Sequence, residues 1–361
     1  MSIYVEDWQV EYGRPNRMEL DDELEGGARL VEDGDELCFH AGEDPDLDTL
    51  RLACVDGVRR AEALLYARDD DTGDEARGVA GAYAWGAVIL DPGERPYFLK
   101  CNVERLAIWG ASQRAELPEV PGGFRWTSVP IDDPDLAAPL TELENRMGKS
   151  ERKLAAELAR KDFLTLVDGP LKFLREKPHP RIVGYIKTHY RQLLDTRDHR
   201  RVPELPVGSR TSLFALGEDR LSAYVRIGAP STIGSPWTGL VRIELFQTFG
   251  LEAAQREADR IAGALPRLAG VPHRDPRAPQ NLQPVGALET HLRRLMGSPR
   301  LATRAARDAV AIASRRINER RGQLSAEGDL IAQAAQAARA EHPRHVGQVS
   351  EEPAAPSEAH S

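Results

Sequence analysis

Cysteine is scarce in this chain of 361 residues, which contains only Cys38, Cys54 and Cys101. Their spacing matches no metal-binding motif, and three thiols cannot all pair with one another, so they favour a reducing cytoplasm. No apolar run approaches the ~20 residues that a membrane span needs. The acidic, aromatic start MSIYVEDWQVEYG also lacks the basic and then apolar order of a signal peptide. We therefore expect a cytoplasmic protein without a membrane partner.

Familiar catalytic motifs are missing too. No glycine cluster precedes a helix in the Walker or Rossmann form, so the chain has no motor motif of its own. The Gly-x-Ser-x-Gly elbow is absent, and the nine histidines do not show His-Glu-x-x-His spacing. The remaining candidates for chemistry are carboxylates.

Positive charge is in overall deficit, since the formal net charge at pH 7 is −9. The deficit is uneven, because acidic residues crowd the first fifty positions and the tail. Basic residues gather in the later segments HYRQLLDTRDHRR, LPRLAGVPHRDPR and HLRRLMGSPRLATRAARDAVAIASRRINERR. Local positive patches, rather than the total, set affinity for phosphate. The total charge therefore does not exclude a nucleic-acid partner.

Hydrophobic patterning predicts a sheet that begins with an antiparallel meander. An acidic, irregular N-terminal segment, residues 1–48, precedes a first clear strand over Leu50–Val55. The β-like runs RRAEALLYARD, ARGVAGAYAWGAVIL and RPYFLKCNVERLAIWG follow, and turns separate them. A Pro/Gly-rich connector, LPEVPGGFRWTSVPIDDPD, ends this part of the chain.

Helix and strand patterns mix after the connector. Apolar residues recur at helical spacing over 135–161, with DDPD as an N-terminal capping region. The strands DFLTLVD and RIVGYIKTHY, the hairpin RTSLFALGEDRLSAYVRIG, the strand GLVRIELFQ and the helix LEAAQREADRIAGALPRLA come next. Two further helices are expected over 285–296 and 299–321, and the last fifteen or so residues should be disordered.

This order predicts an α/β fold with a mixed sheet, in which an antiparallel meander is flanked by helices. A three-strand meander, a crossover helix and then strands parallel to the first match the ribonuclease H-like scheme. We expect the main domain at 49–297, a C-terminal helix at 298–323 and a largely disordered tail at 324–361.

Two apolar strands end in the same tripeptide, Val-Asp-Gly, at Asp56 and at Asp168. Turn chemistry alone can explain both, because Asp and Gly are common turn residues. The alternative is a metal site, since carboxylates at the ends of neighbouring parallel strands lie side by side. Two such acids repel each other unless a cation neutralises them, and Mg²⁺ or Mn²⁺ suits oxygen ligands.

A third acid is expected from the helix before the Asp168 strand. Glu151 shares one helix face with Glu144, Met147 and Leu154, and that face points partly at the sheet. Most glutamates of such a helix are solvated. We choose Glu151 as the site residue and hold Glu144 in reserve.

The sequence resembles the NurA family of nucleases, which work with HerA-type hexameric ATPases in DNA end processing. The resemblance lies in CVDGVRR, SERKLAAELARKDFLTLVDGPL, RIVGYIKTHY, YVRIG, GLVRIEL and HRDPRAPQNLQPVGALETHLRRLMG, and it spans roughly residues 50–297. No single piece is specific, because Asp-Gly after a strand is common, but the ordered set is fairly specific.

The resemblance implies a ribonuclease H-like core, a homodimer and a Mn²⁺ or Mg²⁺ site that cuts DNA. Carried over by motif, it makes Asp56, Glu151 and Asp168 metal ligands and places Lys187 where a cation contacts the scissile phosphate. Many relatives carry an Ala-His pair in the late Pro-rich segment, and this chain lacks it. His273, Asp275 or Glu289 are the possible replacements, and we choose His273.

Nucleic-acid contacts are expected from arginine and tryptophan. Arg226 and Arg242, on adjacent strands, and Arg277 are candidate phosphate contacts, although surface ion pairs are the commoner role. Trp109, Trp126 and Trp237 can stack on bases, although tryptophans are more often packed in a core. The basic helix over 299–321 is most simply a packed helix with a solvated face, and DNA or partner binding is the alternative.

These features together predict a cytoplasmic, metal-dependent DNA nuclease that processes 5′ ends with a HerA-like hexameric ATPase. A first alternative is a catalytically silent NurA-like subunit that binds DNA or the ATPase, because the Ala-His pair is missing. A second is another ribonuclease H-like nuclease, which acts on RNA or displaced strands in phage defence.

Overall fold

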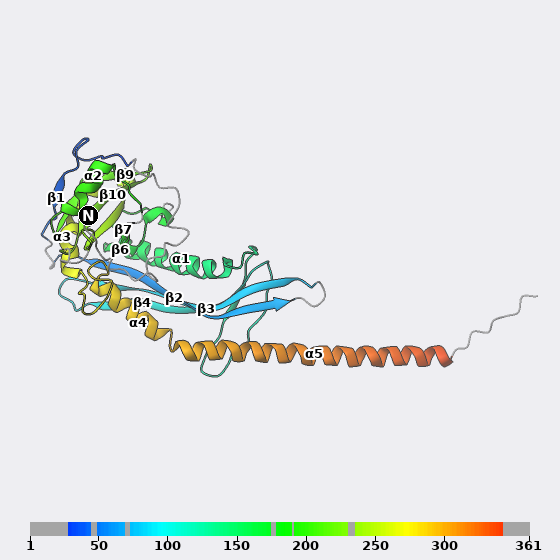
Figure 1. Ribbon diagram of the computed structural model, residues 1–361. Coiled ribbons are helices and arrows are strands. Elements are labelled where there is room, and N and C mark those ends of the chain that lie inside the picture. The colour runs from blue at the N-terminus through cyan, green and yellow to red at the C-terminus, as the bar shows by residue number, and fades with distance from the viewer. Residues whose placement is uncertain are drawn as a thin grey trace, which may run out of the picture.

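A single mixed sheet organises the computed structural model, which describes residues 28–44, 49–68, 73–174, 178–189, 191–229 and 235–341. Eleven strands form this sheet in the order β1-β8-β10-β11-β7-β6-β2-β3-β4-β5, and β9 pairs with β10 off this path. Helices flank the sheet, so the predicted mixed α/β class is confirmed (Figure 1). The strands are β1 (Phe39–Ala41), β2 (Leu52–Arg68), β3 (Glu75–Leu90), β4 (Tyr97–Trp109), β5 (Thr127–Pro130), β6 (Leu164–Asp168), β7 (Ile182–Ile186), β8 (Ser209–Thr211), β9 (Phe214–Leu216), β10 (Arg220–Arg226) and β11 (Leu240–Phe246).

The predicted meander is present, but its first strand is much longer than expected. β2, β3 and β4 pair antiparallel in sequence order. The residue pattern predicts one strand that ends at Val55 and another that begins at Arg59, whereas β2 runs through both without a turn. Strand pairing overrides the turn signal here, because Asp56 lies opposite Gly86 and Gly57 opposite Trp85 of β3. The connector after β4 also contains a strand that was not predicted, β5, which pairs parallel with β4.

The next strands run parallel to the first. β6 pairs parallel with β2, and β7 pairs parallel with β6, as predicted. The long helix α1 (Ala138–Arg160) makes the crossover and contacts β2, β3 and β6. β11 then pairs antiparallel with β7 and with β10. β6 pairs with Leu52–Val55, the start of β2, so Asp168 at the end of β6 lies beside Asp56 within β2.

Alternating side chains divide the middle of the sheet into two apolar layers. Ala53 and Val55 face α1 and pack with Leu154 and Leu158. Cys54 and its neighbours on β6 and β7 face the opposite side, where they pack with residues of α3 and α4. The remaining helices are α2 (Thr196–Arg201), α3 (Leu251–Leu268), α4 (Gln283–Leu295) and α5 (Pro299–Glu341), and the short 3-10 turns are Leu171–Leu174, Val202–Glu204 and Gln247–Phe249.

The acidic N-terminal segment joins the sheet where the structure describes it. β1 pairs antiparallel with β8, and the carboxylate of Glu32 accepts hydrogen bonds from the Arg210 guanidinium at 2.6 and 3.0 Å. Residues 29–41 therefore belong to the folded body, whereas 1–27 and 45–48 lie outside the described residues.

The C-terminal helix is longer than predicted. α5 packs on the meander through Ala305, Ala306 and Ala309, and then extends away from the body (Figure 1). It continues to Glu341, so residues 324–341, expected in a disordered tail, are helical. The last fifteen residues, which we expect to be disordered, lie outside the described residues. In the part of the chain that the structure describes, no helix combines the length and apolarity needed to cross a membrane.

Candidate metal centre

Asp56 lies within β2, on the sheet face that packs against α3 and α4. Its neighbours along that face, Cys54 and Val58, are core residues, and Asp56 itself is only 5% exposed. The Oδ2 atom of Asp56 is buried, and no group among the described residues donates a hydrogen bond to it. An unpartnered buried carboxylate oxygen is costly, so such an atom in a native fold calls for an explanation such as an ion.

Asp168 is the last residue of β6, and here the turn interpretation of Val-Asp-Gly is confirmed. Gly169 has φ +88°, which favours glycine, and its N–H donates to the carbonyl of Tyr185 on β7. The Tyr185 hydroxyl in turn donates to the carbonyl of Gln280 at 2.6 Å. Asp168 is therefore held at the strand end while its side chain stays 45% exposed, where a ligand can reach it.

Glu151 is the α1 glutamate that lies against the sheet. Glu142, Glu144 and Glu157 pair instead with Arg146, Arg59 and Lys100, respectively. A Cβ atom added to Gly57 would overlap Oε1 of Glu151, so this carboxylate is next to the β2 backbone beside Asp56. The Glu151 residue as a whole is half-buried. Its carboxylate group, however, is surrounded by protein atoms.

Gly57 thus has a role that its sequence context does not predict. It does not make a turn, because β2 continues through it. The absence of a side chain lets the Glu151 carboxylate and Met147 Cγ approach the strand. The two Val-Asp-Gly segments therefore look alike in sequence but use their glycines differently, one for close approach and one for a turn.

Lys187 follows β7 and supplies the positive charge of the centre. Its Nζ atom is 3.1 Å from Oδ1 of Asp168, and its side chain is only 11% exposed. Burial disfavours the charged form, but Asp168, Asp56 and Glu289 raise the pKa of Lys187 above its usual value. The ammonium therefore stays charged at neutral pH beside the carboxylates.

The carboxylates of the centre resist ionisation together. Burial and the charge of Asp168 raise the pKa of Asp56 well above its usual value, and Glu289 and Glu151 add to this effect. Burial and Asp168 also raise the pKa of Glu151 to about 7. More negative charge is gathered here than Lys187 balances, which is the situation that a bound divalent cation relieves.

The donor set fits a hard cation. Asp56, Glu151 and Asp168 offer only oxygen atoms as ligands. Among the described residues no hydrogen bond uses the lone pairs of Asp56 Oδ2, so they can bind a cation. These three residues are not among the described groups whose ligand atoms all lie within 4.8 Å of one another. Their ligand atoms therefore do not all lie within 4.8 Å of one another in this structure.

The structure does not bring His273 to the three acids, whereas it brings Glu289 close to Asp56. His273 lies exposed in the turn between α3 and α4, and among the described residues no contact links it to the three acids. Glu289 is buried on α4, and its charge acts on both Asp56 and Lys187. Arg277 donates to both of its oxygens, at 2.9 and 2.8 Å, and also to Asp275. Arg277 thus orients Glu289, and Asp275 supports Arg277.

Two of the predicted phosphate-binding arginines are internal. Arg226 is 2% exposed and donates to the carbonyls of Thr238, Pro203 and Pro236. Arg242 donates to Oε1 of Glu244 at 2.7 Å, and Oε2 of Glu244 accepts from the backbone of Leu171. Arg226 therefore fixes a loop, and Arg242 braces the turn after Asp168. Their burial argues against the expected nucleic-acid contacts.

The tryptophans also belong to the interior. Trp109 and Trp126 are 3% and 2% exposed, within an apolar cluster under α5. Trp237 packs with His189, His199 and Tyr224. The packing role that was weighed against base stacking is the one seen for these side chains.

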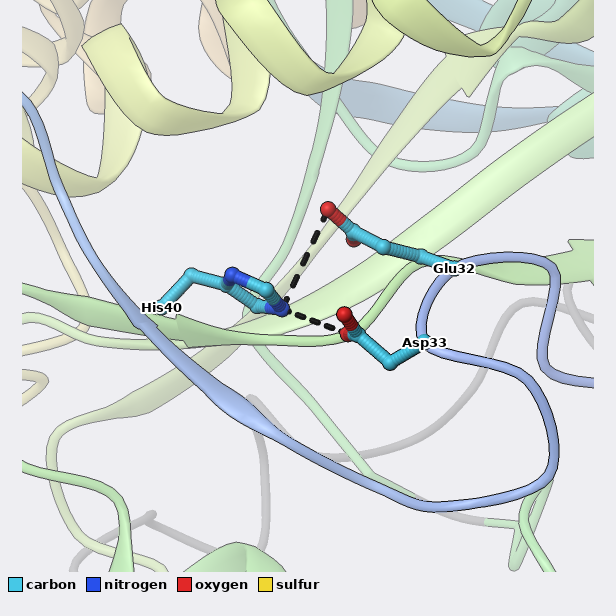
Figure 2. A group of neighbouring side chains, drawn as sticks. All are labelled: Glu32, Asp33 and His40. Carbon is cyan, nitrogen blue, oxygen red and sulfur yellow. Dashed lines mark hydrogen bonds and ion pairs between the residues drawn. The ribbon is translucent and has the colours of Figure 1, made fainter.

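A second acidic cluster, Glu32, Asp33 and His40, has its ligand atoms within 4.8 Å of one another (Figure 2). His40 Nε2 is 2.6 Å from Asp33 Oδ2, which also accepts from Ser212. Both oxygens of Glu32 already accept hydrogen bonds, from Arg210, Gln255 and the backbone of Leu213. The cluster thus satisfies its own charges and fastens the N-terminal segment to the sheet.

Glu32→Gln is expected to destabilise the fold by about 3 kcal/mol at pH 7, because it breaks a buried ion pair. Burial by itself would raise the pKa of Glu32. The hydrogen bonds from Arg210 outweigh this effect and hold the pKa below its usual 4.5. A lowered pKa stabilises the fold above pH 4.5, and this stabilisation fades as pH falls through the folded-state pKa. Urea unfolding of both proteins at pH 7 and at acid pH measures the difference. The exposed control Glu116→Gln should change little, and an unchanged difference at acid pH would contradict the assignment.

Comparison with known proteins leaves the function open. No family model matches the chain, and no curated protein matches it in sequence. The arrangement of Asp56, Glu151, Asp168, Lys187 and Glu289 is therefore the basis for a functional assignment.

Proposed function

We propose that the chain is a metal-dependent DNA nuclease of the NurA type, built on a ribonuclease H-like core. The strand order supports the fold: β4, β3 and β2 form a meander, and β6 and β7 extend it in parallel with β2. The crossover by α1 between the meander and β6 agrees with the same scheme.

The observation that carries the proposal is the partnerless Oδ2 of Asp56 among other acids. Asp56 comes from β2, Glu151 from α1, Asp168 from β6 and Lys187 from the end of β7. Four separate elements thus bring three carboxylates and one ammonium together around one sheet region. A purely structural cluster would pair its charges, as the Glu32 cluster does.

Asp56, Glu151 and Asp168 would hold Mg²⁺ or Mn²⁺. Glu289, whose oxygens already accept hydrogen bonds from Arg277 and Arg293, would add negative charge beside Asp56. When bound, the metal supplies Lewis acidity for phosphodiester hydrolysis. Lys187 places its charge where it can contact a non-bridging phosphate oxygen and orient the strand. Arg277 keeps the Glu289 carboxylate in a fixed position, and Gly57 leaves room for Glu151. The chain's own residues therefore position substrate and metal, as in-line displacement requires.

The wider setting of the proposal is a cytoplasmic homodimer that processes DNA 5′ ends with a HerA-like hexameric ATPase. The chain carries no motor motif of its own, so an ATPase would have to move the DNA. The exposed Asp168 side of the centre would receive the strand.

Wild-type protein with Mn²⁺ is expected to digest labelled single- and double-stranded DNA. Asp168→Asn and Glu151→Gln should lower the rate more than ~100-fold, because even residues that merely orient metal ligands change activity by roughly 10–100-fold. Asp308→Asn, on the exposed face of α5, should cut at the wild-type rate. Product formation on denaturing gels measures each rate.

The outcomes separate the proposal from its alternatives. If wild type binds DNA but neither it nor any variant cuts, the protein is a silent binding subunit. If it cuts RNA and leaves DNA intact, the ribonuclease H-like defence role replaces DNA end processing.

A further inference from the structure

A pocket of about 820 Å³ lies beside the metal centre, between the start of β4, the turn after α3 and the helix α4. Its size is within the range of pockets that hold small organic groups. Glu289 and Arg277 are among its lining residues, so the pocket adjoins the candidate metal centre. Of the residues expected in the site, Arg277 and the alternatives Glu289 and Asp275 line this pocket. The pocket itself was not predicted.

An exposed aromatic residue, Phe98, lines this pocket. Phe98 is 40% exposed, and its ring stacks on that of His291 from α4 at 4.3 Å with an 11° interplanar angle. Tyr97, also a lining residue, is 37% exposed. Flat aromatic rings can stack on nucleobases.

The charge of the lining is positive. Four arginines and two carboxylates contribute, and both carboxylates, Asp275 and Glu289, bond to Arg277. Arg274 is exposed, and among the described residues no ion pair engages its guanidinium. Arg267 and Arg293 add charge at the rim, although each also pairs with an acid. Phosphate groups are the natural ligands of such a rim.

Strand geometry places the ring near the acids. Phe98 pairs with Val88 of β3, which pairs with Cys54 of β2, two residues before Asp56. Two strand spacings and one two-residue step give ~12 Å between the Cα atoms of Phe98 and Asp56. Both face the α4 side of the sheet, because Phe98 contacts His291 and Glu289 acts on Asp56.

From these observations we propose that the pocket binds one unpaired nucleotide of a single-stranded DNA segment. The base stacks on Phe98, which His291 supports from behind, and the neighbouring phosphate contacts Arg274. This inference rests on the proposed function, since it takes the strand to be the one cut at Asp56 and Asp168. It adds a requirement that the acids do not impose: the substrate must offer an unpaired base next to the cleavage point.

Binding of a fluorescein-labelled (dT)12 oligonucleotide in EDTA, followed by anisotropy, tests the pocket without any cleavage. Phe98→Ala should weaken binding roughly tenfold, the loss expected for one base–aromatic stack. Phe98→Trp should bind as wild type does. Arg274→Gln should weaken binding and reduce the slope of log affinity against log salt by about 0.7, as expected for one phosphate contact on a single strand. Phe98→Leu, which retains apolar bulk, replaces the alanine variant if that one misfolds.

Matched controls lie outside the pocket. Phe249 is 38% exposed, much like Phe98, and Arg114 is 62% exposed, and neither lines the pocket. Phe249→Ala and Arg114→Gln should leave affinity unchanged. Equal affinities of Phe98→Ala and Phe249→Ala would overturn the proposal. So would a blunt duplex or free dTMP that binds as tightly as the oligonucleotide.

Failure of the two proposals can be told apart. Loss of binding in EDTA on Phe98 substitution supports the pocket whether or not Mn²⁺ supports cleavage. Conversely, normal Mn²⁺-dependent cleavage with unchanged binding by Phe98→Ala would retain the nuclease and remove the nucleotide pocket.

Discussion

Asp56→Asn is expected to abolish DNA cleavage while making the protein more stable. Both effects follow from the same charge. Asp56 is 5% exposed, and its buried Oδ2 accepts no hydrogen bond from the part of the chain that the structure describes. Burial and Asp168 raise the pKa of this carboxyl, so its ionised form is unfavourable in the fold. A neutral amide of the same shape removes that cost.

The gain is expected to be about 1–3 kcal/mol, or a few degrees in Tm, because a neutral amide costs less than a carboxylate when it is buried without partners. Lys187 loses one attractive neighbour, but Asp168 at 3.1 Å remains. Cleavage should fall more than ~100-fold, since a ligand matters at least as much as the residues that orient it. Stability gained at the expense of activity is typical of residues kept for function.

Asp168→Asn gives the matched comparison. It should also abolish cleavage, but it removes the closest partner of the buried Lys187, so stability should fall instead. Thermal unfolding in EDTA and with added Mn²⁺ measures both effects. The metal should raise the Tm of wild type and have little effect on Asp56→Asn. A lower Tm for Asp56→Asn in EDTA would show that Asp56 has a structural partner.

Gly57→Ala is expected to reduce cleavage severely at a modest cost in stability. The new Cβ would overlap Glu151 Oε1 and lie 2.8 Å from Met147 Cγ, and both are side-chain atoms that can move. The backbone carbonyl of Ala84 at 3.0 Å has to yield only slightly. The Glu151 carboxylate is therefore displaced from Asp56, while the strand itself remains paired.

A double-mutant cycle identifies this cause. If Gly57→Ala acts through Glu151, then Gly57→Ala with Glu151→Ala should cut no more slowly than Glu151→Ala alone. Gly81→Ala is the matched control, because its Cβ would contact the Leu143 side chain of the same helix at 2.7 Å. It should cost similar stability and leave cleavage intact. Additive losses in the double variant would mean that Gly57 acts on the fold rather than on Glu151.

The sequence predicted the meander, the crossover helix and the strands parallel to the first, because these follow from local patterns. Alternating apolar residues and turns identify the meander, and helical spacing identifies α1. The same local rules misplaced the end of the first strand. Asp56 and Gly57 read as a turn, whereas pairing with Gly86 and Trp85 extends β2 through them. Local turn chemistry cannot reveal that a neighbouring strand supplies the competing hydrogen bonds.

The site was predictable only in part. Asp168 and Lys187 were both expected in the site, and they lie near each other because Asp168 ends β6 and Lys187 follows the adjacent parallel strand β7. The roles of Arg242 and Arg277 could not be predicted. An arginine that bonds to a carboxylate has the same sequence signature as one that contacts a phosphate. The pairing of Phe98 with His291 joins residues far apart in the chain, and no periodicity links them.

The length of α5 has a hydrodynamic consequence. Its 43 residues span ~65 Å at 1.5 Å per residue, and beyond Ala309 none of its described side chains is buried. A compact domain of this chain length would have a radius of gyration of ~21 Å. The protruding helix therefore has a length comparable to the width of the body. The frictional coefficient and the rotational diffusion of the molecule depend on this helix as much as on the mass.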